Sequence, residues 1–320
     1  MRILVALLVA AAFGGSVAGA AGPGRITGVT SFRICAAAGS FWPTETIAVA
    51  GQTGWVACKE ESRVVKLDLR RGRELRSVRI GAPVTAVALG YRSVWALDSG
   101  GTLTRISPSS GRVSRRIALG ASRPYNVWIG AGSVWVAADG SGEVFRVSPA
   151  TNRVTARIAV GDGPADMAFD GAAAWVINHR DLGLVRIDTR TNTPSRLVTL
   201  VADAPERMAL LDGSLWITGR GTDVLQVDPA TGAVKDTIEI GASGIDVVAG
   251  QGALWVPARS AAVDRSGFPT MEALRRVVPG RAAATIGKVT GRVDVHGLVA
   301  AGGFVWLADN TNGVLYRVPA

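Results

Sequence analysis

The chain has 320 residues, of which 48% are apolar and 40 are Gly, a composition that suits a large core of short strands joined by tight turns. Charged residues or Gly-rich turns interrupt every apolar run after the N-terminus, which excludes a later membrane-spanning helix. The formal net charge of +10 would ordinarily suggest a nucleic acid, but the basic residues are spread along the chain, so we expect no such partner.

The first predicted element is a signal peptide over residues 1–20. Arg2 precedes an apolar run that ends at Phe13, and small residues up to Ala20 provide a cleavage site. No Cys follows the predicted cut, so a lipid anchor lacks its attachment residue. We therefore expect a secreted or periplasmic monomer, with residues 21–320 forming one domain and no transmembrane segment after signal removal.

The only two cysteines, Cys35 and Cys58, are predicted to enter an oxidising compartment, where a disulfide is the natural pairing. Such a bond would tie the N-terminal segment to the first repeat and stabilise the fold by about 3 kcal/mol on the chain-entropy model. The alternative is that Cys58 is only a small loop residue, since other repeats carry Asp98, Ala138 or Asp309 there.

A repeat of about 40 residues organises the rest of the chain. Each repeat carries one Trp, with spacings of 40, 40, 40, 41, 39 and 51 residues: Trp55, Trp95, Trp135, Trp175, Trp216, Trp255 and Trp306. A unit of this length that reads as four short strands is typical of a β-propeller blade. The sequence therefore predicts an all-β fold, a seven-bladed β-propeller with four antiparallel strands per blade, in which the Trp side chains fill the wedges between blades.

The third unit shows the four strands most clearly, and we name them A to D in chain order. They are predicted at 126–130, 133–137, 143–147 and 154–160. Asp or Ser, then Pro, then Gly or Asn recur in the C-to-D turns, and these types serve the turn itself. The last unit lacks strand D, so we expect residues 25–32 to supply it and close the ring.

Basic residues recur at one position of strand C. They are Lys66, Arg105, Arg146, Arg186 and Arg317, with Gln226 filling the place once. We expect them to be separated charges around the flank of the ring, where they add solubility and loose attraction to an anionic envelope.

The start of strand A is expected to form the rim of the central channel. Nine and ten residues before each Trp, the residue type changes from blade to blade, unlike the turns, as an asymmetric pocket would require. The candidate ligand-binding residues are Glu45, Tyr125, Asn126, Asp166, Glu206, Arg207, Asp246 and His296. The alternative is that rim residues are polar only because they face water.

Four of these rim residues come from three consecutive blades and could converge: Asp166, Glu206, Arg207 and Asp246. Carboxylates there could hold a divalent cation such as Ca²⁺, and Arg207 could pair with an anionic group. No other cofactor is expected. If the rim binds a ligand, Asp166→Ala with Asp246→Ala should abolish binding and leave folding intact.

The longest Trp spacing places an insertion at about 259–271, in the B-to-C loop of the sixth blade. Its side chains Arg259, Asp264, Arg265 and Phe268 are expected to form a flap near the rim.

The segments Ser133-Val-Trp-Val-Ala-Ala-Asp139 and Val144-Phe-Arg-Val-Ser-Pro-Ala-Thr-Asn152 resemble the YVTN-repeat propellers of secreted and surface proteins. The chain also resembles the wider group of streptogramin (virginiamycin B) lyases, which implies seven blades and a metal held with His and Glu residues on the ring face. Only His179 and His296 occur here, in blades well apart, and the lyase-like Trp-Phe-Thr-Glu repeat is absent. Both departures argue against that activity.

These observations favour an exported, non-catalytic binding module that recognises a protein or a cell-envelope polymer at the channel rim. The sequence carries no Gly-x-Ser-x-Gly elbow, no His-Glu-x-x-His and no phosphate-binding Gly loop. The alternative is a metal-assisted lyase or lactonase-type enzyme. A quinone-dependent oxidoreductase comes third, because its cofactor contacts cannot be located.

Overall fold

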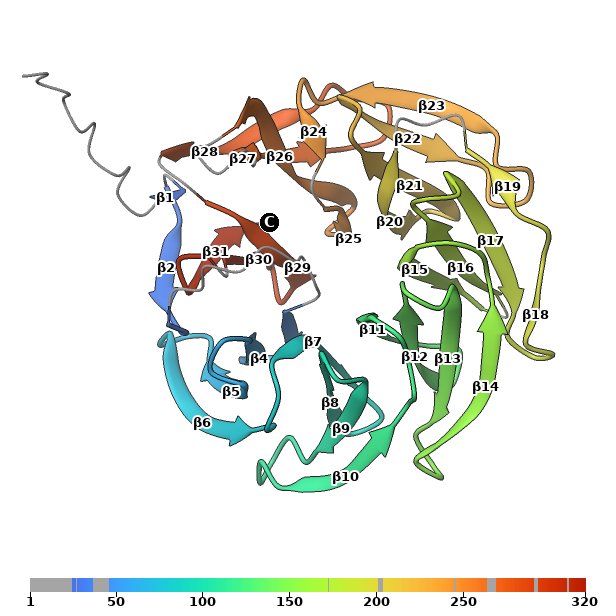
Figure 1. Cartoon of the computed structure of the whole chain (residues 1–320). Coiled ribbons are helices and arrows are strands. Elements are labelled where there is room, and N and C mark those ends of the chain that lie inside the picture. Colours follow the sequence, from blue (N-terminus) through green and yellow to red (C-terminus); the bar gives the residue numbers. More distant parts are fainter. Residues whose placement is uncertain are drawn as a thin grey trace, which may run out of the picture.

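The computed structural model describes residues 25–26, 28–36, 46–171, 173–200, 204–244, 246–263, 269–290, 293–309 and 311–320. These residues form seven antiparallel sheets arranged as a closed ring (Figure 1). The predicted all-β, seven-bladed propeller is confirmed. No helix that could cross a membrane occurs in the described ranges, and the predicted signal peptide at 1–20 lies outside them.

Each blade runs from an inner strand A to an outer strand D. The A strands are β3 (Ile47–Ala50), β7 (Val84–Gly90), β11 (Pro124–Gly130), β15 (Pro164–Asp170), β20 (Pro205–Leu211), β24 (Ser243–Gly244) with β25 (Val248–Gly250), and β29 (Val295–Ala301). The B strands are β4 (Thr53–Cys58), β8 (Ser93–Asp98), β12 (Ser133–Ala138), β16 (Ala173–Asn178), β21 (Ser214–Gly219), β26 (Ala253–Val263) and β30 (Phe304–Asp309).

The D strands on the outside of the ring are largely exposed, whereas the C strands are mostly buried. The C strands are β5 (Arg63–Asp68), β9 (Thr102–Ile106), β13 (Glu143–Ser148), β17 (Gly183–Asp188), β22 (Asp223–Val227), β27 (Pro269–Val277) and β31 (Val314–Pro319). The D strands are β6 (Arg73–Arg79), β10 (Val113–Ala118), β14 (Arg153–Ala159), β18 (Thr193–Pro194) with β19 (Val198–Thr199), β23 (Val234–Glu239), β28 (Ala284–Thr290) and β2 (Thr30–Arg33).

The N-terminal segment closes the ring, as predicted, but it serves two blades. β2 pairs with β31 and completes the seventh blade, while β1 (Arg25–Ile26) pairs with β28 and adds an outer strand to the sixth. In Figure 1 these blue strands lie beside the red ones from the other end of the chain. The predicted disulfide follows directly, because Cys35 after β2 is bonded to Cys58 at the end of β4. Blade 7 is therefore covalently linked to blade 1.

The seven repeated Trp side chains form the centres of the core, and each is no more than 6% exposed. The core divides into seven clusters, and each cluster joins two successive blades. Trp95 of blade 2, for example, packs with Val127 and Val134 of blade 3. The indole N–H commonly donates to the carbonyl that ends strand A, as Trp135 does to Gly130 at 2.9 Å. Filling of the inter-blade wedge by Trp is confirmed, and full burial of each ring stabilises by about 2–3 kcal/mol.

The basic residues of strand C are not the separated surface charges that we expected. Most stack on the Trp of their own blade, at 5.0 Å for both Arg105 and Arg146. Their far ends reach the C-to-D turn of the next blade, where Arg105 donates to the carbonyl of Pro149 at 2.6 Å. A long cation lying on an apolar ring keeps its charge near water while its stem covers the core. These residues therefore link neighbouring blades.

The predicted insertion at 259–271 is largely strand. β26 and β27 are the longest strands of the described chain, and the pairing of Val263 with Pro269 extends their hairpin beyond the usual blade. An inserted segment can continue an antiparallel ladder because each added pair of residues satisfies its own backbone groups. Of the predicted flap, only the side chain of Arg259 is described; Asp264, Arg265 and Phe268 lie outside the described residues.

Candidate functional site

Strand A begins with a β-bulge in at least five blades, and this irregularity positions the rim residues. The register shifts between Pro124 and Asn126, between Pro164 and Asp166, and at the same place in three further blades. A bulge leaves backbone groups outside the ladder. Asn126 and Asp166 accept those free amides, from Val127 at 2.8 Å and Met167 at 2.7 Å. The short polar side chains at this position thus complete the strand ends.

Three of the predicted rim residues are buried, which argues against the alternative that the rim is polar only because it faces water. Asp166 is 4% exposed, Arg207 6% and Asp246 9%. The second oxygen of Asp166 accepts the amide of Met208 in the next blade at 2.7 Å. With both oxygens bonded to backbone, Asp166 joins blade 4 to blade 5.

Arg207 is the centre of the rim cluster, which we define as Tyr125, Asp166, Glu206, Arg207 and Asp246. Its guanidinium donates to the hydroxyl of Tyr125 at 3.0 Å and to the carbonyl of Glu206 at 2.9 Å. Its Nε lies 4.0 Å from a carboxylate oxygen of Asp246. The side chain also lies over the Tyr125 ring, with Cζ 5.6 Å from its centroid. Blades 3, 4, 5 and 6 thus meet at one mouth of the channel, whereas the sequence pattern suggests convergence of blades 4 to 6 alone.

Charge balance in this cluster is set by burial. Burial raises the pKa of Asp166 to about 7, against the opposing effects of Arg207 and the Met208 amide. Burial alone would lower the pKa of Arg207, but Tyr125, Asp246 and Asp166 raise it, so Arg207 stays charged. A permanent cation is therefore held among carboxylates of which one titrates near neutrality.

A second group, which sequence reasoning missed, lies beside the rim cluster. Asp139 follows strand B of blade 3 and is 4% exposed. Its carboxylate forms salt bridges with Arg123 and Arg180, each at 2.6 Å. Arg180 also reaches Asp162 at 2.5 Å, and Nε2 of His179 lies 3.9 Å from Asp139. Burial lowers the pKa of His179, with Asp139 opposing the change. We call these five residues the Asp139 cluster.

A simple signal would have found this group. The position four places after the repeated Trp begins the B-to-C loop in most blades and varies from blade to blade, as the rim does. The residues at this position are Lys59, Ser99, Asp139, His179, Arg220, Arg259 and Asn310. Arg220 lies 3.5 Å from Glu206 of the rim cluster. Two loop sets therefore meet on one face.

Two predicted rim residues cannot be placed in the site. Glu45 lies outside the described residues, and His296 belongs to β29 but its side chain is not described. Asn126 is described and buried, yet its contact is with its own strand end. The binding role of every predicted residue stays a prediction.

Below the rim, the channel holds a cavity of about 310 Å³ lined by the A strands of blades 3 to 7. Its walls include Trp128, Phe169 and Met208, and Asp166 is the one charged side chain among its lining residues. In the described part of the chain, the one group of three potential metal ligands is Cys35, Cys58 and Glu61, and both of its sulfurs are in the disulfide. The described residues thus offer no ready metal site at the rim, and the divalent cation stays a prediction.

No family model matches the sequence, and no curated protein matches it. Among solved structures, the chain is similar to virginiamycin B lyase from Staphylococcus aureus, with a TM-score of 0.72 at 14% identity, covering 93% of this chain and 100% of that one. The predicted resemblance to lyase-like seven-bladed propellers is confirmed at the level of fold.

Two other propeller-containing structures show how widely this fold is used. BamB from Moraxella catarrhalis matches with a TM-score of 0.60 at 13% identity, covering 86% of this chain and 82% of that one. A chain of a mitotic checkpoint complex matches with a TM-score of 0.73 at 14% identity, covering 100% of this chain and 99% of that one. At these identities the similarity establishes the architecture, and function must come from the site.

Proposed function

We propose that this protein is an exported, non-catalytic binding module that recognises a protein or a cell-envelope polymer on the face formed by the rim cluster and the Asp139 cluster. The observation that carries the proposal is the buried ion network from four blades, which orders exposed charges around one channel mouth. The side chains of Arg123, Asp162 and Arg220 are 61%, 61% and 75% exposed. Charges held in this way suit recognition of a partner by electrostatic complementarity.

Four features support an exported binding module. The carboxylate of Asp166 is fully engaged with backbone amides, and Arg207 with Tyr125 and Glu206. The face carries both positive and negative side chains, paired in salt bridges, whereas a nucleic-acid site would gather positive charge. The disulfide is consistent with an oxidising compartment, which fits export. One of the similar structures is part of a protein complex, as its description states.

The test is capture of partners from an envelope extract of the host by the mature protein. The variant Arg220→Glu reverses a charge on the proposed face and leaves its buried network in place. Arg115→Glu on the exposed side of β10 is the matched control. We expect the control to retain the captured partner and Arg220→Glu to lose it. Equal retention by both variants would remove this face from consideration.

The alternative is a metal-assisted lyase or lactonase-type enzyme. The lyase-like fold favours it, as does His179, which lies 3.9 Å from Asp139 and whose pKa is lowered by burial and raised to a lesser extent by the charge of Glu206. A thermal-melting screen against divalent metals and a chelator separates the two functions, because a ligand of the native state must raise its stability. A metal-dependent rise in Tm that is lost in His179→Ala would favour the enzyme. A flat response would favour the binding module.

A further inference from the structure

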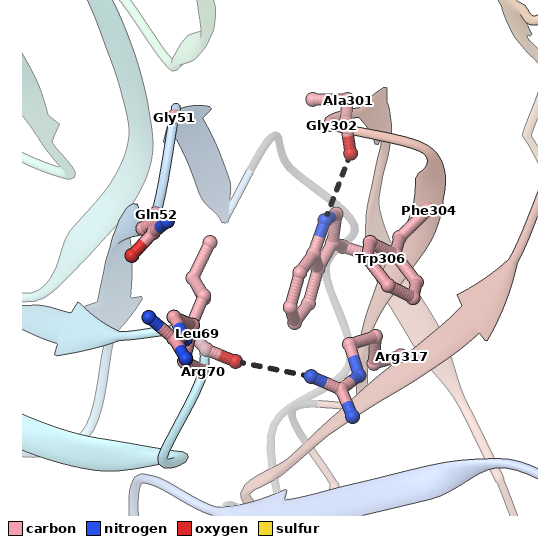
Figure 2. Close-up of a pocket in the computed structure, with 9 residues that line it drawn as sticks. All are labelled: Gly51, Gln52, Leu69, Arg70, Ala301, Gly302, Phe304, Trp306 and Arg317. Atoms are coloured by element: carbon pink, nitrogen blue, oxygen red, sulfur yellow. Dashed lines mark hydrogen bonds between the residues drawn. The ribbon is translucent and has the colours of Figure 1, made fainter.

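A second cavity, of about 410 Å³, lies where the ring closes between blade 7 and blade 1. It opens on the face that carries the A-to-B and C-to-D turns, opposite the rim. Figure 2 shows Gln52, Leu69 and Arg70 of blade 1 on one side, and Phe304 and Arg317 of blade 7 on the other. The size falls within the usual range of small-molecule sites.

At the first three junctions a strand-C cation is hydrogen-bonded to the turn of the next blade. Lys66 of blade 1 donates to Pro108 of blade 2 at 2.7 Å. Arg105 of blade 2 is held at both ends, by Ser93 of its own blade at 2.8 Å and by Asn152 of blade 3 at 2.8 Å. Arg146 of blade 3 repeats this arrangement with Ser133 and Asn192.

The closing junction lacks both of these anchors. Phe304 stands where Ser93 and Ser133 stand in their blades. Gly72 stands at the position of the turn Asn, as Gly111 and Gly232 do in two other blades, and Phe32 occupies the space of a side chain there. Arg317 reaches the carbonyl of Leu69 only at 3.5 Å and lies instead between Phe304 and Phe32, 5.0 and 5.8 Å from their centroids. The cation is thus retained, but its neutral acceptors are distant, with the carbonyl of Leu69 at 3.5 Å and the hydroxyl of Thr30 at 3.4 Å.

The open space combines aromatic surface with positive charge. Phe304 and Trp306 are in ring contact at 5.9 Å and form one wall. Arg70 is exposed at the entrance, and within the described ranges neither Arg70 nor Arg317 forms a salt bridge with a carboxylate. A guanidinium with free donors is the preferred partner of a planar carboxylate. We propose that the closing junction binds a small aromatic carboxylate, with its ring against Phe304 and Trp306 and its carboxylate on Arg317 and Arg70.

This site is independent of the proposed rim function, so calorimetric titration with defined probes tests it separately. N-acetyl-phenylalanine is compared with N-acetyl-phenylalaninamide, which keeps the ring and lacks the charge. We expect the acid to bind about tenfold more tightly than the amide, the difference that a charge-assisted hydrogen bond provides. A phenylalanine-terminated peptide, tested with a free and an amidated end, distinguishes a free molecule from a chain terminus as the source of the carboxylate.

Two neighbouring arginines supply the matched variants. Arg70→Gln removes an exposed group of the cavity and should weaken binding of the acid about tenfold. Arg71→Gln changes the next residue, whose side chain is 67% exposed and pairs with Asp68, and should leave binding unchanged. Equal affinity for acid and amide, no binding of either, or the same effect from both variants overturns the proposal. Arg317→Gln should abolish binding, with a melting curve to show that the ring remains closed.

Discussion

The two faces of the ring are built from different kinds of position. On the turn face, one solution recurs, in which a strand-C cation crosses a Trp ring and bonds to the next turn, as in Arg105 and Arg146. On the rim face, equivalent positions carry different residues, and Asp166, Arg207 and Asp246 form a single network that no other set of blades repeats in the described ranges. A position that carries the same residue type in most blades serves the structure of each blade. A position that varies from blade to blade serves a feature that occurs once in the ring.

The closing junction belongs to the repeated face and departs from its rule. Arg317 keeps the cation of the repeat, but Phe304 replaces the anchoring Ser. The other blades carry a small residue at this position, so an aromatic side chain here distinguishes the closing junction from the other six. The predictions below test whether repeated and unrepeated positions differ in energy as well as in pattern.

The largest expected effect is the removal of the buried rim cation. Arg207→Ala should lower the free energy of unfolding by about 3–5 kcal/mol, because Asp246 and Asp166 then lose their buried partner. Arg146→Ala on the repeated face should cost about 1–3 kcal/mol, since its lost partners are neutral and partly hydrated. Urea unfolding of both variants measures the difference. Equal losses would contradict the distinction between the two faces.

Ring closure should depend on its covalent link nearly as strongly. Cys35→Ala with Cys58→Ala should lower the free energy of unfolding by about 3 kcal/mol, the chain-entropy value for a loop of this size. A reducing agent should destabilise the wild type by a similar amount and leave the double variant unaffected. Thiol titration of the denatured, unreduced protein should detect no free Cys. A free thiol, or identical stability of the two proteins, would mean that the strand pairing of β2 suffices.

The rim network should also titrate. The folded-state pKa of Asp166 is raised to about 7 from the ordinary value of 3.8, so the folded protein binds this proton more tightly than the unfolded chain does. The resulting stability is fully present below about pH 4 and is lost as the pH rises to about 7. Asp166→Asn should remove this slope, and should cost about 1–3 kcal/mol at low pH because one amide acceptor is lost.

Chemical unfolding of both proteins between pH 4 and pH 8 measures the effect. Asp309, whose pKa burial raises to about 6, titrates in the same window and contributes to the slope in both proteins. The difference between the two curves therefore reports Asp166 alone. Parallel curves would show that Asp166 stays ionised in the folded protein throughout.

The architecture was predictable because its determinant is local and repeated seven times. A Trp every 40 residues, with turn residues between, identified the blades, and the strands of the third blade were predicted to within two residues. Arg276 was missed as a member of the cation series, because the hairpin extension of β26 and β27 displaces it by ten positions. Counting along a repeat fails where the repeat is interrupted.

The site was predictable only in part. Convergence of Asp166, Arg207 and Asp246 followed from their shared position in adjacent blades. Their burial did not, because it depends on a bulge that exposes backbone amides and turns the side chains inward. The reach of Arg207 to Tyr125, two blades away, depends on the curvature of the ring. Three-dimensional closure, which no single repeat encodes, decides these contacts.

The smallest predicted effect concerns the one described blade in which the strand-C cation is replaced. Gln226 lies opposite Trp216 and donates to Ser214 at 2.8 Å, as Arg105 does to Ser93 at the same distance. Gln226→Arg should therefore restore the repeat and stabilise the protein by about 0.5–1 kcal/mol, the value of an exposed cation–π contact.

The unfolding midpoint in urea measures this gain, and Gln226→Met serves as the control because it lengthens the apolar stem without adding charge. A gain in both variants would assign the effect to packing on Trp216. A gain only with Arg would show that the cation itself stabilises the junction. No gain with Arg would mean that the turn of blade 6, which follows the extended hairpin of β26 and β27, presents no acceptor to it. In that case the insertion in blade 6 would explain the Gln in blade 5, because a strand-C cation stabilises the junction only where the turn of the next blade offers a hydrogen-bond acceptor.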